Sequence, residues 1–201
     1  MIGIGFGLLY ANAGEWGLHK YLLHGLGRRK QSFWSFHWHD HHRNVRKNEH
    51  IDEHYGRSLF GWNAQSKEAL GLVGLGLLHA PLFPVAPFFT GAVWYSTWNY
   101  YRVHKRSHED TAWAREHLPW HYDHHMGPDQ DANWCVTRPW FDDLMGTRRP
   151  YIGTPRERSD IERKRLRSER RAAKKKMPQK STGSGTKTKN ASEPLSSLAF
   201  S

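Results

Sequence analysis

Hydrophobic and polar positions divide the chain into two long apolar stretches, histidine-rich polar segments that follow them, and a strongly polar C-terminal part. The first apolar stretch, Met1 to Leu23, has no ionisable side chain in its first 14 residues. The second, Ala69 to Tyr101, is 33 residues long and lacks Asp, Glu, Lys and Arg. Because a helix needs about 20 apolar residues to cross a bilayer, both stretches predict membrane segments.

The second stretch is long for one span and short for two, and prolines interrupt its middle at positions 81, 84 and 87. This pattern predicts a helical hairpin of two short or tilted passes, with the prolines at its turn. Two other interpretations stay open. The first stretch can instead be a cleaved signal peptide, although no basic segment precedes it, and the second can be a buried helix of a soluble protein.

The net charge of +11 is concentrated near the C-terminus. Residues 155–201 hold 14 of the 30 Lys and Arg residues but only 5 of the 19 Asp and Glu residues. Residues 160–176 predict a polar helix, and residues 181–190, rich in Ser, Gly and Thr, predict disorder. We therefore divide the chain into a membrane domain, residues 1–154, and a basic, largely disordered tail. The tail can lie on anionic lipid, bind nucleic acid or be solvated, and the apolar stretches favour lipid.

Basic residues also follow each apolar stretch. One crossing and one hairpin place all of them on the same side of the membrane, and the positive-inside rule makes that side cytoplasmic. Nearly all the histidines lie on this side. The single cysteine, Cys135, excludes an internal disulfide and a cysteine-based zinc finger.

Histidine occurs 15 times, and most copies fall into four groups. Histidines three or four positions apart share one face of a helix. A single such pair is usually structural, but this many clustered imidazoles would lack partners or repel one another without a metal. Since one ion takes about four to six ligands, their number indicates two ions. The groups are HKYLLH at 19–24, FHWHDHHRN at 36–44, HKRSH at 104–108 and HLPWHYDHH at 117–125, and His50, His54 and His79 stand alone.

The order of these groups around an apolar hairpin resembles that of the fatty acid hydroxylase/sterol desaturase superfamily, which comprises membrane di-iron oxygenases. The segment from Asn133 to Asp142, NWCVTRPWFD, and the Met-Gly-Thr that begins at Met145 are similar to the family's closing segment. The resemblance covers roughly residues 10–152. The chain departs from the family pattern in having Cys135 in place of a glycine and H-x3-HH in place of H-x2-HH.

The resemblance implies an all-α fold: an integral membrane helical bundle with a histidine-rich dimetal site on its cytoplasmic side. His39 and His117 are further candidates, either as ligands or as groups that orient ligands. We prefer His37 to His39, because a spacing of four from His41 places both rings on one helix face. Carried over to this chain, the family's ligand positions are His19, His24, His37, His41, His42, His104, His108, His121, His124 and His125.

Three carboxylates near these groups have expected roles. Asp40 and Asp123 each precede a His-His pair, and each can either accept an imidazole N–H or remain solvated. Asp142 resembles the family's closing aspartate. We expect Asp142 to stabilise the fold rather than to take part in chemistry.

The resemblance implies a di-iron membrane oxidoreductase of lipid biosynthesis, which uses O2 to hydroxylate or desaturate a lipid C–H bond. Its cofactors would be two iron ions, with zinc possible in isolated protein, and a separate protein would donate electrons. The expected location is the endoplasmic reticulum in a eukaryote or the inner membrane in a bacterium, with the active site on the cytoplasmic face. A carotenoid-ring hydroxylase of the same family and a non-catalytic metal-binding membrane protein stay open, and a nucleic-acid partner is disfavoured.

Overall fold

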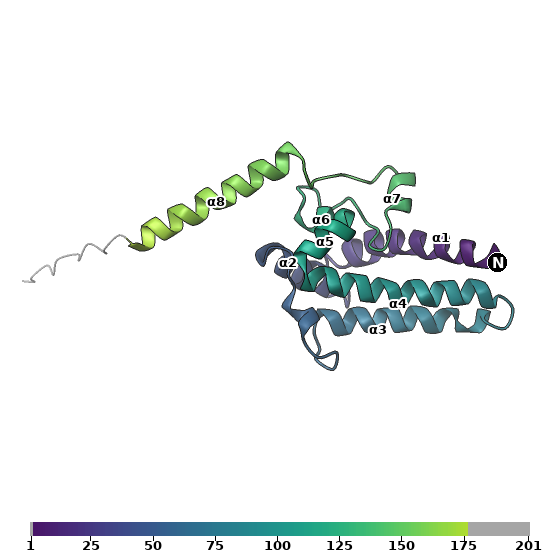
Figure 1. Cartoon of the computed structure of the whole chain (residues 1–201). Coiled ribbons are helices and arrows are strands. Elements are labelled where there is room, and N and C mark those ends of the chain that lie inside the picture. The colour runs from purple at the N-terminus through teal and green to yellow at the C-terminus, as the bar shows by residue number, and fades with distance from the viewer. Residues whose placement is uncertain (1, 177–201) are drawn as a thin grey trace, which may run out of the picture. The chain divides into compact units, whose positions relative to one another are not determined.

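The computed structural model describes residues 2–176, and every regular element among them is helical (Figure 1). This confirms the all-α class. The predicted disorder of residues 181–190 lies outside the described residues. The chain divides into two compact units between Asp160 and Ile161, and all the predicted metal ligands belong to the first. The elements are α1 (Ile2–Gly17), η1 (Leu18–Leu26), η2 (His37–His42), α2 (Arg43–Lys47), η3 (Glu53–Gly56), α3 (Ala64–His79), η4 (Ala80–Leu82), α4 (Pro87–Glu109), α5 (Thr111–His117), α6 (Pro119–Met126), α7 (Trp140–Leu144) and α8 (Pro155–Lys176).

Helices α1, α3 and α4 lie side by side and form the main layer of the first unit (Figure 1). Helix α3 begins where the Asn63 side chain accepts a hydrogen bond from the Ser66 N–H at 3.0 Å, which satisfies a free N–H group of the first turn. Pro81 lies in the short helix η4, and Pro87 opens α4, where a proline loses no hydrogen bond. The two helices and the proline-containing turn of the expected hairpin are therefore confirmed.

Helix α1 approaches α4 closely at Gly7. A Cβ atom on this residue would lie 2.7 Å from both the Ala92 Cβ and the Phe89 carbonyl oxygen, so only glycine fits there. Near this contact, His79 Nε2 lies 3.0 Å from the Tyr10 hydroxyl, and His79 Nδ1 lies 2.8 Å from a carbonyl of its own helix. Both nitrogens of this isolated histidine thus have partners, one in α1 and one in α3.

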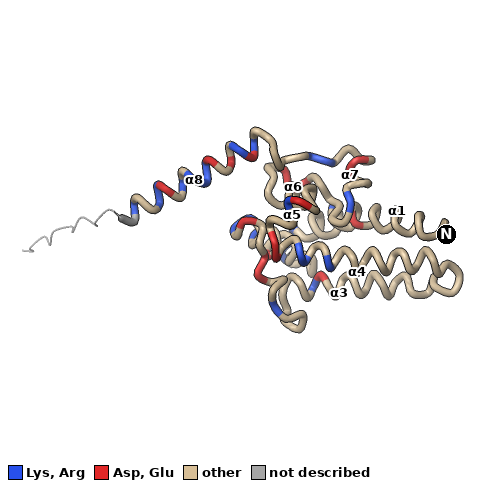
Figure 2. The backbone as a smooth tube through the Cα atoms, viewed as in Figure 1, with Lys and Arg blue, Asp and Glu red and all other residues tan. Residues whose placement is uncertain are grey.

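The two ends of the α1–α3–α4 layer differ in polarity. Charged residues gather at the end next to α2, α5 and α6, whereas the α3–α4 turn and the start of α1 contain none (Figure 2). Apolar side chains are exposed at this uncharged end, among them Ile2, Leu78 and Val85, with exposed fractions of 79%, 73% and 81%. No helix within residues 2–176 combines the length and the apolar character needed to cross a membrane.

The interior near the charged end is built mainly from histidine. Apart from Tyr55 and Gln65, the largest fully buried side chains are all imidazoles. Ordinary cores bury aliphatic and aromatic side chains, and buried polar groups need partners. Two small apolar clusters supplement this interior: Tyr100, Val103, Leu118 and Val136 form one, and Trp16, Trp134 and Cys135 form the other.

Candidate metal centre

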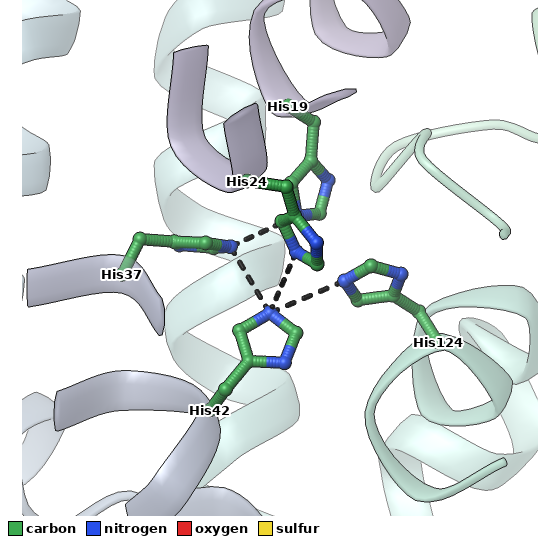
Figure 3. Close-up of side chains that lie close together, drawn as sticks. All are labelled: His19, His24, His37, His42 and His124. Atoms are coloured by element: carbon green, nitrogen blue, oxygen red, sulfur yellow. Dashed lines mark hydrogen bonds between the residues drawn. The ribbon is translucent and has the colours of Figure 1, made fainter. Parts of the chain in front are cut away.

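Most of the buried histidines fall into two adjoining groups, and a third set, His50, His108 and His121, overlaps the second through His108. The first group draws five residues from three segments of the chain, and their imidazole rings face one another (Figure 3). One ligand nitrogen from each residue lies within 4.8 Å of the others. The members of this first group are His19, His24, His37, His42 and His124.

The second group contains His41, His104, His108 and His125, again with ligand nitrogens within 4.8 Å of one another. His121 adjoins this group, because its Nε2 atom lies 3.0 Å from that of His108. The two His-His pairs, His41-His42 and His124-His125, each place one residue in the first group and one in the second. This is because neighbouring residues of a helix point in different directions. The two pairs therefore explain why the groups adjoin.

Two π-helical segments decide which histidines share a group. Hydrogen bonds in a π-helix join residues five apart, so positions i and i+5 lie over one another. Segment η1 carries His19 and His24 at this spacing, and segment η2 carries His37 and His42. Their ring centroids lie 5.0 Å and 4.8 Å apart, respectively.

The expectation that His37 and His41 point at the same metal position is wrong: they belong to different groups, although their ring centroids lie 5.2 Å apart. It assumed α-helical geometry, in which residues four apart share a face. The wider π-helical turn pairs His37 with His42 instead and directs His41 into the second group. His37 is buried in the first group, whereas His39 is half-buried with its Nε2 atom 3.1 Å from the Arg28 carbonyl oxygen.

In His19 and His124, a hydrogen bond at Nδ1 determines whether Nε2 carries a proton or a lone pair. His19 Nδ1 lies 2.6 Å from the carbonyl oxygen of Trp134, and His124 Nδ1 lies 2.6 Å from that of Ala132. A carbonyl oxygen only accepts, so each Nδ1 carries a proton that it donates. The Nε2 atoms of both neutral rings consequently present lone pairs to the middle of the first group.

These inner nitrogens crowd together. The Nε2 atom of His42 lies 3.1 Å from those of both His24 and His37 and 3.3 Å from that of His124 (dashed lines in Figure 3). A ring nitrogen has one proton or one lone pair in its plane, so it cannot form three hydrogen bonds. Nitrogens that bind one ion at about 2.0–2.1 Å are themselves about 2.9–3.4 Å apart. The spacing therefore fits a metal ion better than hydrogen bonding.

Burial favours the neutral form of His42, His104, His124 and His125, which is the form that binds a metal ion. Burial lowers the pKa of His124 to about 4 and holds the pKa of His42 well below its ordinary value. In the second group, burial likewise lowers the pKa of His104 and His125, and neighbouring imidazoles lower it further by charge repulsion. Both groups can thus hold metal ions at neutral pH.

Two carboxylates that we did not single out from the sequence orient the second group. Asp52 lies 2.8 Å from His41 Nδ1, and Glu68 lies 2.8 Å from His104 Nδ1. Such carboxylates fix the ring orientation of a ligand and increase its basicity. Neither residue belongs to a histidine motif. Their only sequence signal is that Glu68 is the last charged residue before the apolar hairpin.

The two carboxylates that precede His-His pairs differ: Asp40 is exposed, one of its two predicted alternatives, whereas Asp123 matches neither. Asp123 is buried and accepts hydrogen bonds from Arg148 and from the Ile152 N–H, both at 2.9 Å. We expected Asp123 either to accept an imidazole N–H or to be solvated. It does neither, because the Arg148 guanidinium and the Ile152 N–H donate to its carboxylate. Asp40 is exposed and borders a surface hollow beside Trp38.

Two carboxylates, buried Asp142 and half-buried Glu15, anchor the closing segment. Asp142 accepts hydrogen bonds from the N–H groups of Trp134 at 2.9 Å and Cys135 at 2.7 Å. Glu15 of α1 accepts two further N–H groups of this segment, at 2.9 and 3.1 Å. Asp142 thus holds the loop whose carbonyl oxygens orient His19 and His124.

All ten predicted ligands lie in this centre. The reserve candidate His117 does not: it is exposed and stacks on Trp113 with ring centroids 4.8 Å apart. His50, which stands alone in the sequence, is buried beside His108 and His121. No periodic pattern could reveal His50, because it lies in a turn outside the helices that carry the other ligands.

Comparisons with protein-family models, curated proteins and solved structures found no match. The class of protein therefore follows from this chain alone. It is an all-α protein whose interior is a polyhistidine centre that can hold metal ions.

Proposed function

We propose that this chain is a membrane-bound oxidoreductase that uses O2 to hydroxylate or desaturate a lipid C–H bond at a histidine-ligated di-iron centre. The observation that carries the proposal is the pair of adjoining buried histidine groups with converging Nε2 atoms. Imidazole nitrogens suit iron and zinc, whereas magnesium and calcium prefer oxygen ligands. Two adjoining positions fit a two-iron centre better than a single structural ion.

Iron bound in these groups would supply the redox chemistry that activates O2 toward an unactivated C–H bond. The chain itself supplies position and environment. Asp52 and Glu68 hold His41 and His104 in one orientation through their Nδ1 protons. The loop carbonyls do the same for His19 in the first group. Burial of all these rings keeps bulk water away from the reacting groups.

The exposed apolar end of the α1–α3–α4 layer supports a membrane location and a lipid substrate. Among the described residues, no Lys, Arg, Asp or Glu lies at this end (Figure 2). Phe6 near the start of α1, Leu77 near the end of α3 and Phe88 at the start of α4 are exposed. Apolar surface in water is unfavourable by about 25 cal/mol per Å², so a large patch of it marks a binding surface for protein or lipid. His19 and His104 follow the apolar parts of α1 and α4 along the chain. A hydrocarbon chain in the bilayer would thus reach the centre from this side.

The reaction also requires electrons from a separate donor protein. Lys30 and Arg43 border the surface hollow beside Trp38, and Trp38 contacts the rings of His24 and His42 at 4.9 and 5.3 Å. Basic side chains at this place favour an acidic donor. By the positive-inside rule, this face would be cytoplasmic.

Metal analysis of the detergent-purified full chain tests the proposal. One variant replaces His121, His124 and His125 by alanine, and the matched control replaces His39 and His117. We expect about two iron ions per chain in the wild type and the control, a loss in the triple variant, and reductant-dependent O2 consumption with a hydroxylated or desaturated lipid product.

Other outcomes decide between the alternatives. Two zinc ions with no O2 consumption after iron reconstitution would favour the non-catalytic metal-binding protein. Less than one metal ion per chain, unchanged in the triple variant, would refute the metal centre and with it the proposed function.

A further inference from the structure

His50 is a fully buried imidazole outside the ten predicted ligands. One of its ring nitrogens lies within 4.8 Å of a ligand nitrogen of His108 and of one of His121. The His50 and His108 ring centroids lie 4.7 Å apart, a separation like those between rings inside the first group. His50 is therefore placed as the ligands are, although it comes from a different kind of segment.

The backbone at His50 is unusual for a residue with a side chain. Glu49 and His50 follow α2 with φ angles of 54° and 82°, a region that favours glycine and asparagine. Hydrogen bonds hold the turn: the His50 N–H donates to the Val45 carbonyl at 2.8 Å, and the Thr111 hydroxyl donates to the Glu49 carbonyl at 3.1 Å. Glycine would fit this backbone without strain, so a buried imidazole here indicates a role for the side chain.

The contacts of His108 show which ion His50 can reach. The His108 Nδ1–H donates to the His50 carbonyl oxygen at 3.0 Å. Only Nε2 of His108 remains for a metal, and a ring nitrogen binds one ion. The set of His50, His108 and His121 therefore shares the ion of the second group and does not form a third position.

We propose that the His50 side chain is a further ligand of the metal ion in the second group, alongside His108 and His121. This inference rests on the proposed metal centre and adds a ligand to it. His41, His104 and His125 share His108 with this set, so His50 adds a ligand from a new segment of the chain to the second group. The main chain of His50 orients His108, and its side chain contacts the ion.

Cobalt(II) binding to the full chain in detergent tests this assignment, because visible cobalt absorption reports the ligands directly and needs no enzymatic activity. The variant His50→Gly suits the left-handed backbone and keeps the carbonyl that orients His108. His50→Asn, which also tolerates this backbone, is the second variant, and His117→Asn is the matched control at an exposed histidine. Circular dichroism establishes that each variant retains its helices.

We expect about two cobalt ions in the wild type. In both His50 variants, the chelator concentration that removes one of the two ions should be at least tenfold lower than in the wild type. The visible spectrum of the bound cobalt should also change. The control should match the wild type. Wild-type spectra and chelator release in the folded His50 variants would overturn this assignment and leave the proposed function intact. A wild-type chain that binds no cobalt, iron or zinc would overturn both.

Discussion

Replacing Asp142 by alanine tests how the closing segment supports the metal centre. Asp142 is fully buried and accepts the N–H groups of Trp134 and Cys135 and the Thr147 hydroxyl, at 2.7–2.9 Å. Alanine would leave two buried N–H groups without an acceptor, at about 1–3 kcal/mol each. Removal of a buried charge offsets part of this loss. We expect the free energy of unfolding to fall by about 2–4 kcal/mol.

The same substitution should loosen the first histidine group. The Trp134 carbonyl that orients His19 belongs to the residue whose N–H Asp142 accepts. A ligand that loses its fixed orientation typically weakens metal binding by about 10–100-fold. We therefore expect Asp142→Ala to lose its metal at a chelator concentration about 10–100-fold lower than the wild type does. This loss would come in addition to its lower free energy of unfolding.

Denaturant unfolding of the metal-free protein in detergent, followed by circular dichroism, measures the first effect, and chelator competition measures the second. Asp143→Ala is the matched control, because Asp143 is the next residue of α7 and is exposed. If Asp142→Ala and Asp143→Ala have the same unfolding midpoint and the same chelator curve, the reasoning about Asp142 is refuted.

Three further predictions follow from the structure. Glu68→Gln weakens the hold on His104 and should lower metal affinity about 10–100-fold in chelator competition, whereas Glu109→Gln at an exposed site should not; equal curves would contradict the role of Glu68. Because burial lowers the folded-state pKa of the centre's histidines, the unfolded chain binds more protons below about pH 6.5, so the metal-free protein should lose stability as pH falls below this value. Denaturation midpoints measured from pH 8 to about pH 5 check this sign, and a constant midpoint would argue against buried neutral imidazoles. Leu78→Lys combined with Val85→Lys at the exposed apolar end should reduce co-flotation with lipid vesicles several-fold, and unchanged flotation would argue against membrane insertion of that end.

Several features of this protein were accessible from the pattern of residues. Three prolines in a charge-free stretch predicted the α3–α4 hairpin, because proline disrupts the interior of a helix and is tolerated in its first turn. The pair His104 and His108 follows α-helical periodicity, so its common direction was predictable. The trio His121, His124 and His125 divides instead, because His124 belongs to the first group and His125 to the second. Local rules of this kind hold because they depend on residues within one or two turns of each other.

The pairing of histidines across groups needed the tertiary structure. The spacing of His37, His41 and His42 is compatible with either an α- or a π-helical turn, and only the packing of η2 shows that His37 joins His42. The difference matters, because a π-helical turn widens the repeat from four to five residues and sends the intervening histidine to the other group.

The groups that support the ligands come from distant parts of the chain. Asp52 and Glu68 reach His41 and His104 from separate segments, and His50 enters through a left-handed turn. No local pattern encodes these contacts, since long-range packing alone brings the residues together. The sequence therefore sufficed to predict the helical class and ten of the eleven histidines that converge in the interior. Their partition into two groups, and the carboxylates and carbonyls that aim them, depended on how the helices pack.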